Sequence, residues 1–312
     1  MGGVQGFLAD FMKGSLVMEN YASRKVFVVF NVLLLSFIAF LCLLPILNLI
    51  AVSFSTRSVV EANQVGLWPK GFNTSSFQYI FANPQFFKSL WNTVERTFLG
   101  WVVELGLTIL IAYPLSKSQK VFRLRGVYVW FFMVTMVFNG GLIPTYLVVN
   151  ELDLVNSVWS LILPEAVVMF NVLLMLNFFR TIPGELEEAA LIDGAGWLVT
   201  MVRVYLPLSL PSLATITLFI LVRHWNSWFD GLIFMNLPDR YPLMTYLQTM
   251  VLNLDLSQLS STALANNPQL LEITGRSLRS AMILACTLPI LLVYPFLQRF
   301  FVKGMLLGSV KG

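Results

Sequence analysis

Long apolar runs separated by short polar segments divide this chain along its whole length. A helix needs about 20 residues to cross a hydrocarbon core of about 30 Å, and backbone groups buried there require helices or closed barrels. Unbroken runs of this length indicate helices. The pattern therefore predicts an all-α membrane protein with about six transmembrane helices, near residues 26–54, 89–115, 127–149, 158–178, 210–234 and 280–301.

Composition supports the same class of protein. Hydrophobic residues make up 57% of the 312 residues and charged residues 12%, whereas soluble proteins carry about 25% charged residues. The two cysteines, Cys42 and Cys286, both lie in apolar runs, and His224 is the single histidine. A disulfide framework and a Cys-based or His-rich metal site are thereby excluded, so we expect no metal-binding residues.

The basic residues gather in the polar segments between the apolar runs, which is typical of cytoplasmic loops and not of a nucleic-acid-binding groove. We therefore expect membrane lipid around the chain and no nucleic-acid partner. The segments on the side of the N-terminus hold 12 Lys and Arg residues, and the opposite side holds 6. The contrast is clearest between residues 117–125, with four basic residues, and residues 139–157, with none. Both termini are therefore predicted to be cytoplasmic.

The first apolar run follows Arg24 and Lys25, as in a secretory signal, but it is too long for a signal and no cleavage site of small residues follows it. We expect it to remain as a span. Two long segments are predicted on the outer side, one between the first and second spans and one between the fifth and sixth. Each is interpreted either as a docking surface for an external partner or as a solvated cap. The predicted organisation is a cytoplasmic N-terminal segment (1–25), the first span with an outer loop (26–88), a core domain with an inner loop at 180–208 (89–301), and a cytoplasmic C-terminal tail (302–312).

The inner loop between the fourth and fifth spans has a pattern of its own. Pro183 suits the first turn of a helix, and the glutamates that follow it complement the positive end of the helix dipole. Residues 189–192 continue this helix, and two glycines that follow them end it. A second short helix is predicted at 197–205, before Pro207 turns the chain back into the membrane.

Within this loop, Glu188-Ala189-Ala190 is followed after three residues by Gly194, and after nine more by Val204, one further residue and Leu206-Pro207. This spacing resembles the EAA motif of the integral-membrane subunits of binding-protein-dependent ATP-binding-cassette (ABC) importers, with every interval kept. The one departure is Val204, where isoleucine is usual.

The resemblance implies the fold of a type I ABC importer permease and a place in the bacterial cytoplasmic (inner) membrane. Its implied partners are a second related permease, two ATP-binding-cassette ATPase subunits and an extracytoplasmic solute-binding protein. The chain would be a transport subunit and not an enzyme. It would hold no cofactor, with ATP and Mg bound on the ATPase subunits, and its sequence contains no P-loop motif.

The resemblance also assigns the inner loop to coupling with the ATPase. Small side chains would let its helix seat closely in a cleft of an ATPase subunit, and Glu188 and Asp193 would offer charge-assisted contacts. The alternative is an amphipathic interfacial helix without a partner. The implied coupling residues are Glu187, Glu188, Ala189, Ala190, Asp193, Gly194, Leu206 and Pro207.

Further segments look like those of carbohydrate-type permeases. These are Trp225-Asn-Ser-Trp228, Tyr241-Pro-Leu and residues 301–312. The stretch Asn139-Gly-Gly-Leu-Ile-Pro-Thr-Tyr146 looks more particularly like permeases for oligosaccharides of the aldouronate or polysaccharide kind. The implied role is to form half of the membrane path for an oligosaccharide.

Polar residues inside the apolar runs point to that path. A charge at mid-bilayer costs about 2.5–3.5 kcal/mol, so such residues normally face a bundle interior or a water-filled route. Arg223, Asn226 and Asp230 would share one face of the fifth span at helical spacing. Alternatively, Arg223 and Asp230 pair with each other and the tryptophans are interfacial anchors. The candidate path residues are Asn139, Asn171, Arg223, Trp225, Asn226, Trp228 and Asp230.

Three other classes remain as alternatives. A stand-alone secondary transporter or channel for a small polar solute would need coupling carboxylates, for which Glu104, Glu165 and Asp230 are the candidates. An intramembrane hydrolase would need His224 and Ser227 to act together, whereas a lone histidine more commonly packs between helices. A non-transporting scaffold would leave the polar residues of the fifth span unused. The secondary transporter leaves the EAA spacing unexplained, and we expect no catalytic residues.

Overall fold

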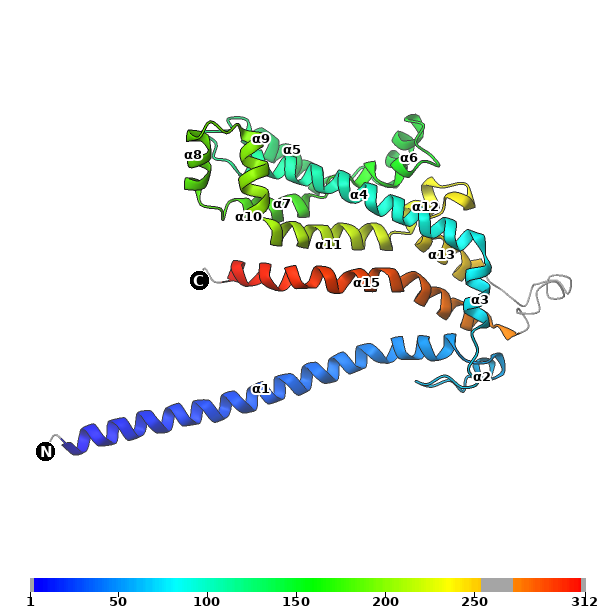
Figure 1. Cartoon of the computed structure of the whole chain (residues 1–312), viewed down its shortest axis with the longest axis horizontal. Coiled ribbons are helices and arrows are strands. Elements are labelled where there is room, and N and C mark those ends of the chain that lie inside the picture. The colour runs from blue at the N-terminus through cyan, green and yellow to red at the C-terminus, as the bar shows by residue number, and fades with distance from the viewer. Residues whose placement is uncertain (1–2, 254–271, 310–312) are drawn as a thin grey trace. The chain divides into compact units, whose positions relative to one another are not determined.

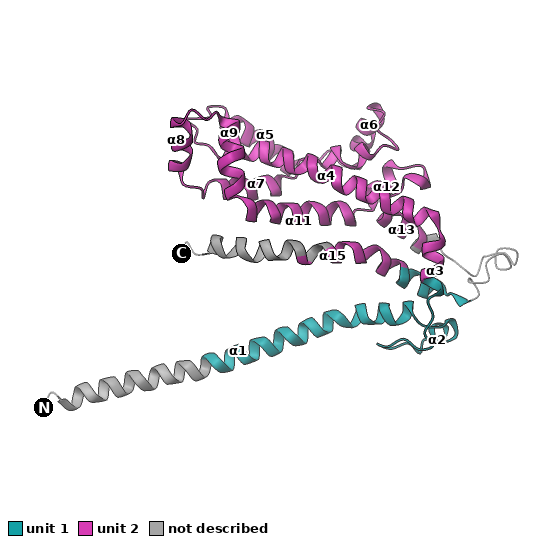
Figure 2. Cartoon of the chain, in the orientation of Figure 1, with its two compact units in different colours: residues 1–76, 268–281 teal, residues 77–267, 282–312 magenta. Residues whose placement is uncertain are grey.

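The computed structural model describes the backbone of residues 3–253 and 272–309, and side chains within residues 24–250 and 272–292 and at residue 295. Over these residues the named elements are helices, as predicted, and one isolated β-bridge joins Ser55 to Phe72 (Figure 1). The chain divides into two compact units, residues 1–76 with 268–281 and residues 77–267 with 282–312 (Figure 2). Each unit is described by itself.

The first unit contains helix α1 (Gly3–Ser53) and the short helix α2 (Arg57–Glu61). The predicted first span began at residue 26, but α1 runs unbroken from Gly3, because residues 3–25 contain no proline to interrupt it. After α1, the rings of Phe54 and Phe72 stack with centroids 5.4 Å apart. The Ser75 hydroxyl donates to Glu272, which joins the two chain segments of this unit.

The second unit is built around helix α4 (Pro84–Ser116). Asn83 caps its first turn by accepting a hydrogen bond from the Gln85 N–H, and Pro84 occupies the position where no N–H is needed. Helices α7 (Met169–Phe179) and α11 (Leu210–Asn226) pack against α4. The apolar core that they share contains Ala112, Tyr113, Leu115, Val172, Met175, Leu176, Phe179, Met201, Tyr205, Ile216 and Ile220.

Two of the predicted spans are bent pairs of helices, and a third bend joins the inner loop to the fifth span. Helices α5 (Arg125–Val137) and α6 (Leu142–Glu151) meet at 114°. The sequence Asn139-Gly140-Gly141 separates the two helices, with Gly141 at φ +85°. The 3₁₀ helices η1 (Val158–Leu161) and η2 (Leu163–Glu165) meet α7 at 54°, and Trp197–Leu208 meets α11 at 84°.

Counted over the described residues, three helices are long and apolar enough to cross a membrane, and up to six if each bent pair is one span. The three single helices are Arg24–Ser53, Pro84–Ser116 and Gly275–Leu292. The number of spans therefore agrees with the prediction of about six when each bent pair is counted as one span.

The fifth predicted span, residues 210–234, is wrong as a single helix. Helix α11 ends at Asn226, Ser227 is extended, and α12 (Phe229–Phe234) begins a new helix. The break has a local cause: the Asp230 carboxylate accepts hydrogen bonds from the Ser227 hydroxyl and the Gly231 N–H, and such bonds compete with helix continuation.

The remaining elements follow this break. They are helix α3 (Ser75–Ala82), which begins before α4, the 3₁₀ helix η4 (Pro238–Arg240), helix α13 (Leu243–Asn253) and helix α15 (Gly275–Ser309). The last predicted span ended at residue 301, whereas α15 continues to Ser309. Residues 302–309 of the predicted tail are thus helical, and residues 310–312 lie outside the described residues. The predicted boundary at residue 88 falls inside α4, and the cytoplasmic placement of both end segments stays a prediction.

Candidate functional site

The inner loop forms a separate helical end of the second unit. Helix α8 (Gly184–Ile192) starts after Pro183 with Glu185 and Glu187 in its first turn. It ends at Ile192, and the φ of +82° at Gly194, two residues later, lets the Ala195 N–H reach the Ala190 carbonyl at 2.9 Å. Gly194 of the motif therefore adopts a backbone conformation that is unfavourable for residues with a Cβ.

The second helix of the loop is longer than predicted. It was expected to end at Tyr205, but α9 (Trp197–Thr200), the π-helical turn η3 (Met201–Tyr205) and α10 (Leu206–Leu208) follow one another without a gap. Pro207 lies in the first turn of α10, where its missing N–H is tolerated. The turn of the chain comes at Ser209, which precedes α11.

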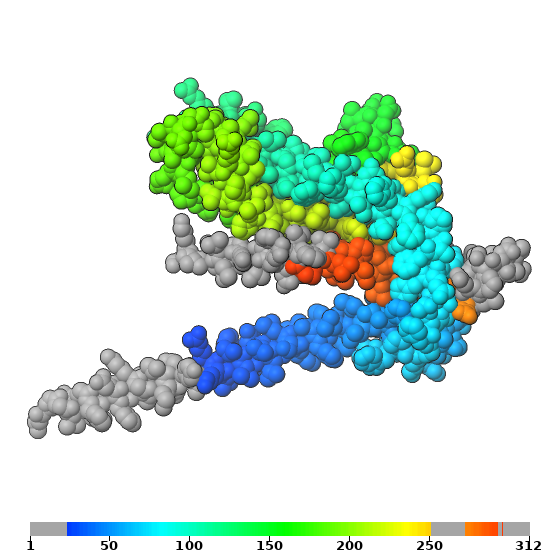
Figure 3. Space-filling model, in the orientation of Figure 1, coloured from blue at the N-terminus to red at the C-terminus, as the bar shows by residue number. Residues whose placement is uncertain are grey.

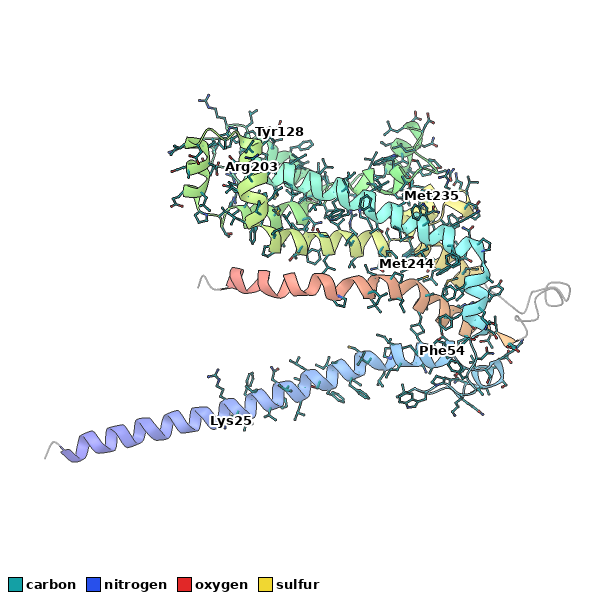
Figure 4. All side chains as sticks on the ribbon, in the orientation of Figure 1. Lys25, Phe54, Tyr128, Arg203, Met235 and Met244 are labelled. Carbon is teal, nitrogen blue, oxygen red and sulfur yellow. The ribbon has the colours of Figure 1, made fainter. Side chains whose placement is uncertain are left out.

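Helix α8 is exposed on nearly all sides. None of its residues is buried, and Glu188, Ala189, Asp193 and Gly194 are exposed, as is Pro207 further on. Apolar side chains share this exposure, with Ile192 at 86%. Figure 1 and Figure 3 show α8 and α9 together at one end of the second unit, and Figure 4 shows Arg203 at that end and Met235 at the other. Exposed apolar residues concentrated on a short helix are typical of a protein-binding surface.

One predicted coupling residue, Glu187, points inward. Its carboxylate lies 2.7 Å from the Lys117 ammonium and accepts a hydrogen bond from the Tyr205 hydroxyl. The ammonium also lies 4.1 Å from the centre of the Tyr113 ring and 3.9 Å from that of Tyr205. Burial lowers the pKa of Lys117, and the bond with Glu187 acts in the opposite direction. Glu187 thus fastens α8 to the end of α4.

A second polar cluster lies inside the unit around Glu104 of α4, which is fully buried. Its carboxylate accepts from the Arg223 guanidinium and from the Asn171 amide at 2.8 Å, and it lies 3.4 Å from Nε2 of His224. Arg223 also pairs with Glu165 at the end of η2. One carboxylate of α4 therefore holds α7 and α11, and through Arg223 it holds η2 as well.

A third cluster lies two helical turns away from Glu104, around Arg96 of α4. The buried Arg96 guanidinium pairs with Asp230 at the start of α12. It also donates to the carbonyl of Ser227 and to that of Leu161, each at 3.4 Å. Arg96 thus contacts the break after α11 and the 3₁₀ segment η1.

The alternative pairing of Arg223 with Asp230 is wrong, because each is bound to a different residue of α4. The broken helix also means that Arg223, Asn226 and Asp230 do not share one helical face, since α11 ends at Asn226. The prediction that Arg223 and Asp230 lie on the same face assumed one continuous helix through the fifth span. The guanidinium of Arg96 overrides that spacing by binding the carboxylate after the break.

Of the seven candidate path residues, four are bound to protein atoms and three are exposed. Asn171 and Trp225 are buried and engaged, the Trp225 ring N–H donating to the Cys286 carbonyl at 3.1 Å. Arg223 and Asp230 are held in the ion pairs described above. The exposed candidates are Asn139, Asn226 and Trp228, of which Trp228 is 40% exposed. The structure does not bring all seven together.

The residues that the sequence did not single out as a site are Arg96, Lys117 and Tyr205. A signal existed for Arg96, because a charge inside a span requires a partner. Lys117 was read only as a residue that sets orientation. No local pattern connects it to Glu187, which lies 70 positions later in the chain.

The geometry also bears on the alternative functions. The carboxylates proposed for ion coupling, Glu104, Glu165 and Asp230, are each paired with an arginine. The Ser227 hydroxyl donates to Asp230 and not to His224. His224 is buried and packs against Gly100 of α4, as expected of a packing histidine. Within the described residues, no group of three or more His, Cys, Asp or Glu side chains could hold a metal ion.

Comparisons with known proteins give a consistent picture. Protein LplC of Bacillus subtilis (strain 168) is 38% identical over 95% of this chain and 98% of its own. The polygalacturonan/rhamnogalacturonan transport system permease protein YtcP of the same organism is 39% identical over 91% of this chain and 98% of its own. No family model matches the chain.

A solved structure gives the same answer for the fold. It is the crystal structure of a bacterial ABC transporter involved in the import of the acidic polysaccharide alginate. One of its chains superposes with a TM-score of 0.81 at 32% identity, covering 89% of this chain and 98% of that one. In such importers the permease works with ATPase subunits, a paired permease and a binding protein.

A relative from Escherichia coli (strain K12) carries the name of an inner-membrane permease. The apolar helices and bent pairs described above fit a multi-pass protein of that membrane. The chain belongs to the permease subunits of carbohydrate-uptake ABC importers, multi-pass inner-membrane proteins whose ATP is hydrolysed on separate ATPase subunits.

Proposed function

We propose that this chain forms half of the membrane path for an oligosaccharide that an extracytoplasmic binding protein delivers. A second, related permease forms the other half, and two ATPase subunits drive the cycle. The names of two relatives support a saccharide of polysaccharide origin, since one is a polygalacturonan/rhamnogalacturonan permease and another belongs to an alginate importer.

The observation that carries the coupling role is the exposure of α8. The helix bearing Glu188-Ala189-Ala190 buries none of its residues within this chain, yet it presents apolar side chains such as Ile192. Small residues on its surface permit close approach by a partner, and Glu188 and Asp193 supply charge-assisted contacts. A cleft on an ATPase subunit fits this combination, and α8 then lies on the cytoplasmic side with both termini.

The substrate path draws on the exposed candidates. Trp228 offers a flat ring on which a sugar stacks, and the Asn226 amide offers hydrogen bonds to hydroxyls. Asn139 offers its amide NH₂, since its side-chain oxygen accepts from the Gly141 N–H. Asn171, Trp225, Arg223 and Asp230 act indirectly, because their polar groups already bind protein atoms. They fix the positions of the segments that carry the exposed residues.

Co-purification tests the coupling role. The complex is isolated through a tag on this chain, and the ATPase subunit retained is measured for wild type, Glu188→Lys and Gly194→Asp. We expect both substitutions to reduce the retained ATPase at least fivefold. The control is Glu151→Lys, an equal charge reversal on exposed α6, at the end of the unit away from α8 (Figure 1). Retention of the ATPase at wild-type level by both α8 variants would refute docking through α8.

Uptake into vesicles tests the substrate. Complexes reconstituted with the binding protein are supplied with ATP and with labelled oligosaccharides of galacturonate, of alginate or of a neutral sugar. We expect an oligosaccharide to be transported and Trp228→Ala to reduce that transport while the ATPase subunit stays bound. Transport of none of these saccharides, or an unchanged rate for Trp228→Ala, would contradict the corresponding part of the proposal.

A further inference from the structure

The contacts of Glu187 differ from those of every other residue of α8. Of the α8 side chains, Glu187 alone has a hydrogen bond or ion pair with another described residue. Glu185 and Glu188, on the same helix, are exposed. A helix whose other residues face outward is therefore joined to the membrane unit by polar contacts through one carboxylate.

The partner of Glu187, Lys117, is buried and held by several contacts. The Lys117 side chain is 8% exposed, and its ammonium contacts the rings of both Tyr113 and Tyr205. A buried lysine is unfavourable unless it is paired, and here the ion pair and two cation–π contacts compensate. Tyr205 completes the joint, since its ring contacts the ammonium and its hydroxyl donates to Glu187.

Lys117 leads directly into α4, because it is the C-terminal capping residue of that helix. At 1.5 Å per residue, Glu104 lies about 20 Å along the helix from Lys117, and Arg96 about 30 Å. These two residues hold the segments that surround the helix breaks, namely α7, α11, η1, η2 and α12. A displacement of Lys117 along the axis of α4 therefore acts on the helix that contacts both breaks.

The covalent route from α8 is less direct. It passes through α9, η3 and α10, and it meets α11 at an angle of 84° after Ser209. Such a bend absorbs rotation of one segment against the next. The contact between Glu187 and Lys117 bypasses this bend and acts on α4 itself.

We propose that Glu187, Lys117 and Tyr205 form the joint through which movement of α8 is passed to α4 and from there to the helix breaks at residues 166–168, between η2 and α7, and at residues 227–231. This inference rests on the proposed docking of an ATPase on α8 and adds the route beyond it. Lys117 is a positioning residue, acting through α4 without contact with substrate or ATPase.

The test is made on the whole complex in lipid nanodiscs, with and without Mg-ATP and vanadate. Hydrogen exchange is followed at two places, α8 and residues 227–231. In wild type, nucleotide is expected to change exchange at both. In Lys117→Met and Glu187→Gln, we expect the nucleotide-dependent change in exchange at α8 and the bound ATPase to persist. The change in exchange at residues 227–231 should fall at least fivefold, and fivefold is the lower end of the usual coupling between two sites.

Further variants separate the joint from general destabilisation. Glu185→Gln makes the same chemical change on the same helix and is expected to behave as wild type. Tyr205→Phe keeps the ring but removes the hydroxyl, so an intermediate loss is expected. The double variant Lys117→Met/Glu187→Gln should be no worse than either single variant, because both remove one contact.

Three results would overturn the inference. The first is a change at residues 227–231 of wild-type size in Lys117→Met and Glu187→Gln. The second is loss of the ATPase subunit from these variants, which would make the contact part of docking. The third is a wild-type complex that holds no ATPase, in which case the proposed function fails first and the joint with it. Bound ATPase and exchange at the break are separate readouts, so the failures are distinguishable.

Discussion

Replacing Glu104 with glutamine should destabilise the protein strongly, although the two side chains have nearly the same shape. The substitution keeps an oxygen for the Asn171 amide, which now lies 2.8 Å from the carboxylate. It removes the negative charge that faces the Arg223 guanidinium and lies near His224. The arginine is then left with Glu165 as its acidic partner among the described residues.

The magnitude follows from burial. Two unit charges about 3 Å apart at an effective dielectric constant of 20 attract each other by about 5 kcal/mol, and desolvation of both ions offsets much of this. Removing one partner of a buried pair nevertheless costs about 3–5 kcal/mol, because the other charge stays buried. Glu104 is fully buried, but the Arg223 side chain is 29% exposed and keeps Glu165. We therefore expect about 3 kcal/mol, the lower end of that range.

The matched control is Glu165→Gln, which removes the other carboxylate of the same arginine. The Glu165 side chain is 68% exposed, and exposed pairs contribute at most about 1 kcal/mol. The free energy of unfolding is measured by titration with SDS in mixed micelles, followed by circular dichroism. The reasoning is refuted if Glu165→Gln costs as much as Glu104→Gln.

Two glycines give further predictions. Gly100→Ala places a Cβ 2.5 Å from Nε2 of the buried His224, so overpacking should cost about 1–3 kcal/mol of unfolding free energy in the same assay. Gly106→Ala on the same helix meets no atom within 4 Å and should be neutral or stabilising, so an equal loss for both would be contradictory. Gly194→Ala meets no atom either, but its φ of +82° should cost about 1–2 kcal/mol and lower ATPase retention about 5- to 30-fold. Gly196→Ala, which has no such φ, should retain the ATPase, and equal retention by both variants would disprove the backbone argument.

The positions of the spans were largely predictable from the sequence, because hydropathy reports how much of a segment avoids water. The break at residues 138–141 was also predictable, since Asn139-Gly140-Gly141 disfavours a helix locally. The break after Asn226 was not. It goes with hydrogen bonds from Ser227 and Gly231 to the Asp230 carboxylate, which Arg96, 134 positions earlier, also binds, and hydropathy contains no information on these contacts.

The coupling loop shows the same limit. The spacing from Glu188 to Pro207 is a local property, and the positions of α8 and its terminating Gly194 follow from it. The direction of Glu187 does not, because it depends on a lysine at the end of another helix. The sequence grouped Glu187 with the outward-facing residues, and the structure separates it from them.

The charges inside this permease are best explained by its broken helices. A helix break in a membrane exposes carbonyl groups that lack the usual partners, and these must be satisfied within the protein. Arg96 donates to the carbonyls of Leu161 and Ser227, and Arg223 donates to that of Glu165. Each guanidinium thus serves a break while a carboxylate balances its charge, and Arg is suited to this because its planar fork donates in several directions at once. The same ions that would suggest a proton relay in a secondary transporter here stabilise an irregular backbone, and they do so from α4, the helix to which Lys117 connects the coupling loop.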